Sequence, residues 1–150
     1  MMRLCLIFLL FPVLALTQPN SDSIRISIPD TTISVGDSVS IPIRVSDLSG
    51  HNIISYEFSF SYSPATLRYI GLDEQRTLSS DGKVMDNPDS TSGRVKAAGI
   101  FVKPLTGAGT LLYLRFIPQQ PDTLSLRFSN VVFNTENISQ INGGRIIVQP

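Results

Sequence analysis

The sequence predicts an all-β fold, a sandwich of two antiparallel sheets, and three observations support this class. Apolar and polar residues alternate in several short runs, which is the pattern of strands with one buried face. Segments rich in Gly, Pro, Asn and Asp separate these runs at the spacing typical of a β-sandwich. No window of about 11 residues or more shows a helical period. The chain has 150 residues, 42% of them hydrophobic, which is enough for one domain with a substantial core.

The first 17 residues have the layout of a secretory signal peptide. Arg3 gives a positive start, an almost unbroken apolar run extends from Leu4 to Leu16, and a polar segment begins at Gln18. The apolar run is short for a membrane span, although an uncleaved N-terminal anchor is the alternative interpretation. We therefore expect cleavage near position 17/18 and a secreted protein with no membrane span after cleavage. The mature chain would have a short linker at 18–23 and one domain over 24–150.

Cleavage would also change the chemistry of the chain. Cys5 lies in the predicted signal peptide, so the mature domain would contain no cysteine and would depend on its core rather than on disulfides. Loss of Arg3 leaves 11 basic residues (12 − 1) against 12 acidic ones, a net charge of −1. This balance gives no electrostatic reason to expect nucleic acid as a partner.

The first predicted strands lie before position 50. Ile24, Ile26 and Ile28 alternate with polar residues, and a short run at 33–35 leads into a Gly-Asp turn. The next strand, 39–45, contains Pro42, which has no backbone N–H to donate. We therefore expect an edge position or a bulge at Pro42.

The strand around which the fold is organised is predicted at 55–64. Tyr56, Phe58, Phe60 and Tyr62 fall on one face, and small or polar residues fall on the other. Four large rings on one face predict a thick core with a second sheet opposite. The polar face is the first candidate for a partner surface.

The rest of the chain supplies the remaining strands. Leu67 and Tyr69 share one face of a short extended piece, and residues 73–93 are mostly polar turn sequence with one short strand possible at 83–85. The further predicted strands, with a turn at 142–144 before the last one, lie at 94–102, 112–116, 124–129, 131–133 and 145–148. The total is about eight or nine strands.

Four segments match one family in their order and spacing: 35–43, 54–64 with Leu67, 107–116 and 142–146. Together they resemble the cohesin domain, the receptor module of cellulosomes, over about 24–148. The resemblance implies a nine-stranded jelly-roll sandwich that binds dockerins, small calcium-loaded helical domains on polysaccharide-degrading enzymes. It therefore implies calcium on a dockerin-bearing partner and no cofactor on this chain.

The resemblance also implies which face receives the dockerin. In the family, the strand corresponding to 55–62 carries an Asn and an Asp that hydrogen-bond the partner, and Ser55 and Glu57 stand at these positions here. An unpaired polar group costs about 1–3 kcal/mol, so a standard dockerin is expected to fit badly. The alternative is that these are ordinary outer residues of a sandwich. The predicted partner-binding face consists of Ser55, Glu57, Ser59, Lys96, Ala98 and Ile100.

Two other function classes were compared with this one. A carbohydrate-binding module, which would bind polysaccharide directly, usually stacks sugars on exposed rings, but the chain has no Trp and only Tyr113 alternates outward. An enzyme would need an activated nucleophile or paired carboxylates. His51 lies in a loop and Asp73-Glu74 are adjacent, so no catalytic residue is predicted.

A group of acidic and amide residues in the polar segment was considered as a metal site. Asp81, Asp86, Asn87 and Asp89 offer hard oxygen ligands for calcium, but the spacing of an EF-hand loop is absent. We therefore predict turn-forming residues here and no metal site.

Overall fold

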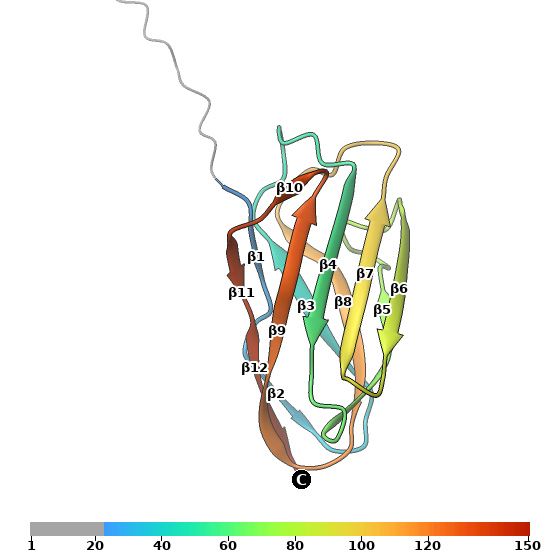
Figure 1. Cartoon of the computed structure of the whole chain (residues 1–150), viewed down its shortest axis with the longest axis vertical. Coiled ribbons are helices and arrows are strands. Elements are labelled where there is room, and N and C mark those ends of the chain that lie inside the picture. Colours follow the sequence, from blue (N-terminus) through green and yellow to red (C-terminus); the bar gives the residue numbers. More distant parts are fainter. Residues whose placement is uncertain (1–22) are drawn as a thin grey trace, which may run out of the picture.

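The structure, a computed structural model, describes residues 23–150, and this part of the chain forms strands and no helix (Figure 1). The predicted signal peptide and residues 18–22 of the linker lie outside the described residues. Residues 23–150 thus contain no helix that could cross a membrane. The strands are β1 (Arg25–Ser27), β2 (Thr31–Ser34), β3 (Val39–Val45), β4 (Ser55–Ser61), β5 (Leu67–Asp73), β6 (Lys83–Asp89), β7 (Arg94–Ile100), β8 (Gly109–Pro118), β9 (Asp122–Phe133), β10 (Glu136–Asn137), β11 (Gln140–Asn142) and β12 (Gly144–Gln149).

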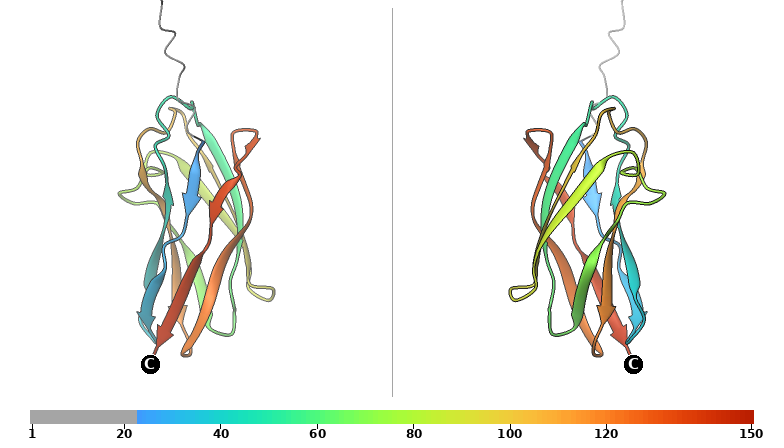
Figure 2. Two further views of the ribbon diagram at one scale, coloured as in Figure 1. Left: turned by 90° about the vertical axis from the view of Figure 1, so that its left-hand side faces the viewer. Right: turned by 90° about the vertical axis from the view of Figure 1, so that its right-hand side faces the viewer.

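The strands form two sheets that pack face to face, as the side views in Figure 2 show. One sheet has the order β11-β1-β3-β8-β5. The other has the order β2-β12-β9-β4-β7-β6, with β10 paired to β9. The predicted two-sheet sandwich is confirmed.

The first and last strands each pass from one sheet to the other. β1 and β11 are parallel neighbours in the first sheet, and β2 and β12 are parallel neighbours in the second. If β1–β2 and β11–β12 are each counted as one strand and β10 as an extension of β9, the number is the predicted nine. These two parallel pairs are exceptions in sheets that are otherwise antiparallel as predicted, and they were not foreseen because local alternation carries no information about the direction of a distant neighbour.

The predicted turn at 142–144 is the point where the last strand changes sheets. Asn142 ends β11 and Gly144 begins β12, so the backbone continues with only one residue between them. A Cβ on Gly143 would collide with the carbonyl oxygen of Leu126, and one on Gly144 would lie 2.8 Å from Ile28 and from the Pro29 carbonyl. Glycine is required here by close packing rather than by a turn.

The core between the sheets is built around β4. The side chains of Tyr56, Phe58, Phe60 and Tyr62 are 3%, 0%, 0% and 7% exposed, which confirms the predicted aromatic inner face. Phe60 contacts Phe116 of the opposite sheet, with ring centroids 6.4 Å apart in an edge-on arrangement. Such aromatic contacts join the two sheets across the sandwich.

Pro42 lies where β3 has a neighbour on one side only. β1 pairs with β3 at Arg44 and Val45, whereas β8 pairs along the whole strand, with a register shift between Ile43 and Arg44. The local edge predicted for Pro42 is therefore confirmed, whereas Pro42 itself pairs regularly with Tyr113 and the register shift lies further along the strand.

The acidic segment 86–89 was predicted as a turn but belongs to strand β6. This strand pairs with β7 along its full length, and the Tyr69 hydroxyl on the opposite sheet donates to the Asp86 carboxylate at 2.8 Å. β6 is an edge strand, so it accommodates Pro88 at little cost. Pairing with the following strand β7 overrides the local turn preference of this sequence.

Candidate functional site

The six residues predicted as a partner face lie together on the outer side of β4 and β7. Ser55 pairs with Ile100, Glu57 with Ala98, and Ser59 with Lys96. The four strands β9, β4, β7 and β6 lie side by side in Figure 1, which looks onto this surface. We call the outer surface of these four strands the β4 face.

One half of the β4 face, the upper half in Figure 1, carries exposed apolar side chains together with two charged ones, Glu57 on β4 and Lys83, which lies opposite Ile100 on β6. Met85, Ala98, Glu57 and Val132 form one row across β6, β7, β4 and β9. Ile100 lies in the next row and is 61% exposed, and Met85 is 54% exposed. We call this half the apolar end. Exposed side chains of this size on a sheet are typical of the apolar centre of a protein–protein interface.

The other half of the β4 face is polar and charged. Its first row contains Asn87, Lys96, Ser59 and Asn130, and its second contains Asp89, Arg94, Ser61 and Arg127. We call this half the charged end. A shallow hollow spans much of it and is lined by Glu57, Ser59, Asn87, Asp89, Arg94, Lys96, Ser129 and Asn130.

The carboxylate of Asp89 is engaged within its own turn. It accepts hydrogen bonds from the Ser92 hydroxyl at 2.7 Å and from the backbone N–H groups of Ser92 and Thr91 at 3.2 and 3.1 Å. These hydrogen bonds, the Ser92 hydroxyl above all, lower the pKa of Asp89 below 3.8. The carboxylate is therefore ionised and fixed at the corner where β6 turns into β7.

Asn134 fixes the start of β4 and was missed at the level of sequence. Its side-chain oxygen accepts hydrogen bonds from the N–H groups of Ile54 and Ser55 at 3.0 and 3.2 Å, and its amide donates to the Asn52 carbonyl at 3.1 Å. Its φ of 53° suits the two-residue turn between β9 and β10. An Asn directly after an apolar run was a signal for this turn, but nothing local indicated that it would hold Ser55.

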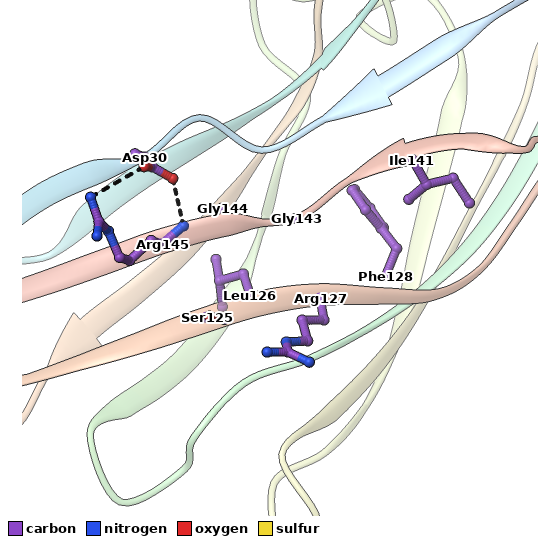
Figure 3. A pocket seen from close by; sticks show the side chains of 9 residues that line it. All are labelled: Asp30, Ser125, Leu126, Arg127, Phe128, Ile141, Gly143, Gly144 and Arg145. Atoms are coloured by element: carbon purple, nitrogen blue, oxygen red, sulfur yellow. Dashed lines mark hydrogen bonds and ion pairs between the residues drawn. The ribbon is translucent and has the colours of Figure 1, made fainter.

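A second hollow lies beside the β4 face, where the chain passes from β11 in the first sheet to β12 in the second (Figure 3). Its volume is about 420 Å³, the same as that of the first hollow, so size does not distinguish them. Arg145 donates from its backbone to the Asp30 carboxylate at 2.8 Å, and its guanidinium lies 3.6 Å from the same carboxylate. Figure 3 shows Phe128 extending from β9 toward the strand that carries Ile141. These contacts tie the strands together, and Arg127, which also lines the hollow, forms no ion pair within 4 Å in the described part of the chain.

The residues considered for catalysis or metal binding are dispersed. His51 lies in the loop before β4, and the Asp73 carboxylate accepts a hydrogen bond from the Gln75 N–H at 2.9 Å. The Asp86 carboxylate accepts a hydrogen bond from the Tyr69 hydroxyl on the inner face of β6. The Asp89 carboxylate accepts one from the Ser92 hydroxyl on the outer face. Within residues 23–150 no group of three or more His, Cys, Asp or Glu side chains is close enough to hold a metal ion.

Aromatic rings offer no broad surface for stacking sugars. In the part of the chain that the structure describes, every Phe and Tyr is buried or half-buried. Tyr113, predicted to point outward, is half-buried on β8 and pairs with Pro42 on one side and Asp73 on the other. One partly covered ring supports direct glycan binding poorly.

Fold and surface together define a jelly-roll sandwich module with one open face that is half apolar and half charged. The family model of the cohesin domain matches residues 24–145. The chain therefore belongs to the cohesin domain family, as the sequence resemblance predicted. No curated protein sequence matches it.

Solved cohesin structures share this fold at low sequence identity. The cohesin in a Coh-OlpA–Doc918 type I cohesin–dockerin complex from Clostridium thermocellum has a TM-score of 0.74 at 12% identity, over 85% of this chain and 100% of that one. A non-cellulosomal cohesin from the archaeon Archaeoglobus fulgidus has a TM-score of 0.72 at 12% identity, over 85% and 92%. The sixth cohesin of Acetivibrio cellulolyticus scaffoldin B, solved with a Cel5 dockerin mutant, has a TM-score of 0.71 at 17% identity, over 85% and 99%. At these identities the comparison establishes the fold.

Proposed function

We propose that this chain is a secreted, non-catalytic receptor module that binds dockerin-bearing proteins through the β4 face. The observation that carries the proposal is the grouping of all six predicted residues on one exposed surface, with Ile100 and Met85 projecting beside them. Cohesins of similar fold have been solved in complexes with dockerins. The dockerin would belong to an enzyme that degrades polysaccharide, and it would carry the calcium.

The dimensions of the β4 face suit a helical partner. Four neighbouring strands about 4.8 Å apart give a surface about 14 Å between its outer strand axes. A helix with its side chains is about 10–12 Å across, so one helix fits along these strands. The partner's apolar side chains would cover Ile100 and Met85, and its polar groups would meet Ser55, Glu57 and Ser59.

Glu57 is the residue whose substitution tests this surface most directly. It is exposed, and its neighbours across the strands are Ala98 and Val132. A partner that covers this row must place a donor or a cation against the Glu57 carboxylate, or leave it unpaired at a cost. Glu57→Lys reverses the charge there and is expected to weaken binding at least about tenfold, with little change in stability.

The experiment is a pull-down of calcium-loaded dockerin modules encoded by the same genome, with the mature chain 18–150 as bait. Asp37→Lys, in the turn between β2 and β3, is the matched control because it makes a similar charge change on an exposed residue away from the β4 face. Calcium-dependent capture that is lost in Glu57→Lys and kept in Asp37→Lys supports the proposal. Failure of the unsubstituted chain to capture any of these dockerins contradicts it, and a panel of polysaccharides then tests the alternative of direct glycan binding.

Secretion is a separate part of the proposal, supported by the layout of residues 1–17. Export into the medium with an N-terminus near Gln18 is the expected result, measured by N-terminal sequencing. Retention of the uncleaved segment in the membrane fraction would instead support the N-terminal anchor.

A further inference from the structure

The charged end of the β4 face carries three cationic side chains in a compact group. Arg94 and Arg127 flank Ser61 in one row, and Lys96 lies two residues from Arg94 on the same face of β7. Strand geometry places the backbone of Arg94 about 10 Å from that of Arg127 and about 7 Å from that of Lys96. We call Arg94, Lys96 and Arg127 the cationic patch.

The cationic patch is only partly neutralised by its surroundings. Within residues 23–150 the one ion pair closer than 4 Å joins Arg145 to Asp30, outside the patch. Asp89 is the acidic residue in these two rows, and its carboxylate is held by Ser92 and Thr91. The two rows therefore carry three positive charges and one negative charge, and Glu57 in the adjacent row, which lines the same hollow, adds a second negative charge. The result is a local excess of one positive charge in a sequence with a formal net charge of zero.

We propose that the protein bound at the β4 face presents several carboxylates to the cationic patch and apolar side chains to the apolar end. This inference rests on the proposed function and specifies the chemistry of its partner. The backbone spacing of about 7–10 Å gives the three side chains room to bind two or more separate carboxylates at once. Arginine provides a planar fork that matches a carboxylate, so Arg94 and Arg127 suit this role.

The division of the β4 face also sets the direction in which the partner binds. A partner turned end for end would place its carboxylates beside Met85, Ile100 and the single cation Lys83, and its apolar groups on the cationic patch. Its carboxylates would then face one cation instead of three, and its apolar groups would desolvate the three cations of the patch without a counter-charge, which disfavours that orientation. The arrangement therefore favours one orientation of an acidic partner surface.

The test uses the dockerin captured in the pull-down and measures its affinity and association rate at about 50 mM and about 500 mM NaCl. The test variant is the triple substitution Arg94→Gln, Lys96→Gln, Arg127→Gln. The matched control removes three arginines from the outer face of the other sheet: Arg44→Gln, Arg68→Gln, Arg115→Gln. Thermal melts verify that both variants fold, which is expected because the substituted side chains are exposed or half-buried.

Binding by the unsubstituted chain is expected to weaken about tenfold at the higher salt concentration, chiefly through slower association. The patch variant should bind about tenfold more weakly at low salt and lose most of its salt dependence, while the control variant should behave like the unsubstituted chain. Calcium-dependent binding that is indifferent to salt and to the patch variant overturns this inference and leaves the proposed function standing. Absence of any dockerin binding overturns both.

A polyanionic polysaccharide is the other source of carboxylates. Polygalacturonate, titrated into the same three proteins, is expected not to bind at about 150 mM NaCl. Binding that the patch variant abolishes, without dockerin binding, would assign the patch to an acidic glycan and overturn the proposal of an acidic protein surface.

Discussion

The two faces of β4 are built from alternate residues of one strand and have opposite properties. Toward the second sheet, Phe58 and Phe60 are fully buried and contact other rings. Toward the outside, Glu57 and Ser59 lie in open rows with neighbours from β7 and β9. Stability should therefore depend on the even positions and recognition on the odd ones, so that the two can be altered separately.

The largest effect expected from this comparison is at Phe58. Its ring is 0% exposed and contacts Tyr56 at 5.8 Å and Phe128 edge-on at 5.9 Å. Phe58→Ala leaves a cavity in the middle of the core and is expected to lower the free energy of unfolding by about 3–5 kcal/mol. Chemical denaturation measures this change. The adjacent Ser59→Ala should change it by less than about 0.5 kcal/mol, and equal stability of the two variants would show that the faces are reversed.

A smaller effect is expected at Gly99, which lies on the inner face of β7 against the ring of Tyr56. Gly99 pairs with Tyr56 across the strands, and a Cβ added there would lie 2.5 Å from Cζ and 2.9 Å from the hydroxyl of Tyr56. That hydroxyl is fixed by a buried hydrogen bond to Ser79 at 2.8 Å, so the ring has little room to move. Gly99→Ala is therefore expected to cost about 1–3 kcal/mol of unfolding free energy.

A double-mutant cycle separates this collision from any general effect of alanine in β7. In a Tyr56→Leu background, which removes the ring, the cost of Gly99→Ala should fall by about half or more. Strictly additive costs would contradict the collision. The neighbouring Ala98→Gly, on the outer face, serves as the control for backbone effects in the same strand.

The same comparison explains what the sequence could and could not reveal. Alternation in 55–62 is a local pattern, so it predicted both faces of β4 before any neighbour was known. Strand pairing is not contained in the pattern of one segment. A short strand was expected at 83–85, but residues 86–89 of β6 were mistaken for a turn because their strand character depends on pairing with β7 and on the hydrogen bond from Tyr69 to Asp86. For the same reason the parallel neighbours of the first and last strands were not foreseen.

The candidate site divides in the same way. The alternation within one strand was enough to predict that Ser55, Glu57 and Ser59 share an outer face. The family resemblance added Lys96, Ala98 and Ile100 to that predicted face. The contribution of Arg127 requires the register between β4 and β9, which includes a shift between Ser59 and Phe60. The part played by Asn134 requires a side chain that reaches residues about 80 positions earlier in the chain. Neither relation leaves a trace in local composition.

The smallest effect concerns Asp89, at the edge of the cationic patch. Hydrogen bonds from Ser92 and Thr91, together with the charge of Arg94, lower its pKa below 3.8. Because the folded-state pKa is the lower one, the stabilisation of this turn is complete above pH 3.8 and is lost as the pH falls through the folded-state value. The carboxylate is fully exposed, so the effect should remain local to 89–92 and leave global stability almost unchanged.

An NMR titration from about pH 6 to about pH 2, which follows the Asp89 carboxyl carbon and the amides of Thr91 and Ser92, measures this pKa. The expected midpoint lies below 3.8, and Ser92→Ala should raise it, since the Ser92 hydroxyl is the largest cause of the shift. A midpoint at or above 3.8, or one indifferent to Ser92→Ala, would show that the carboxylate is free. In that case the hydrogen bonds from Ser92 and Thr91 would not hold the Asp89 carboxylate at the corner between β6 and β7.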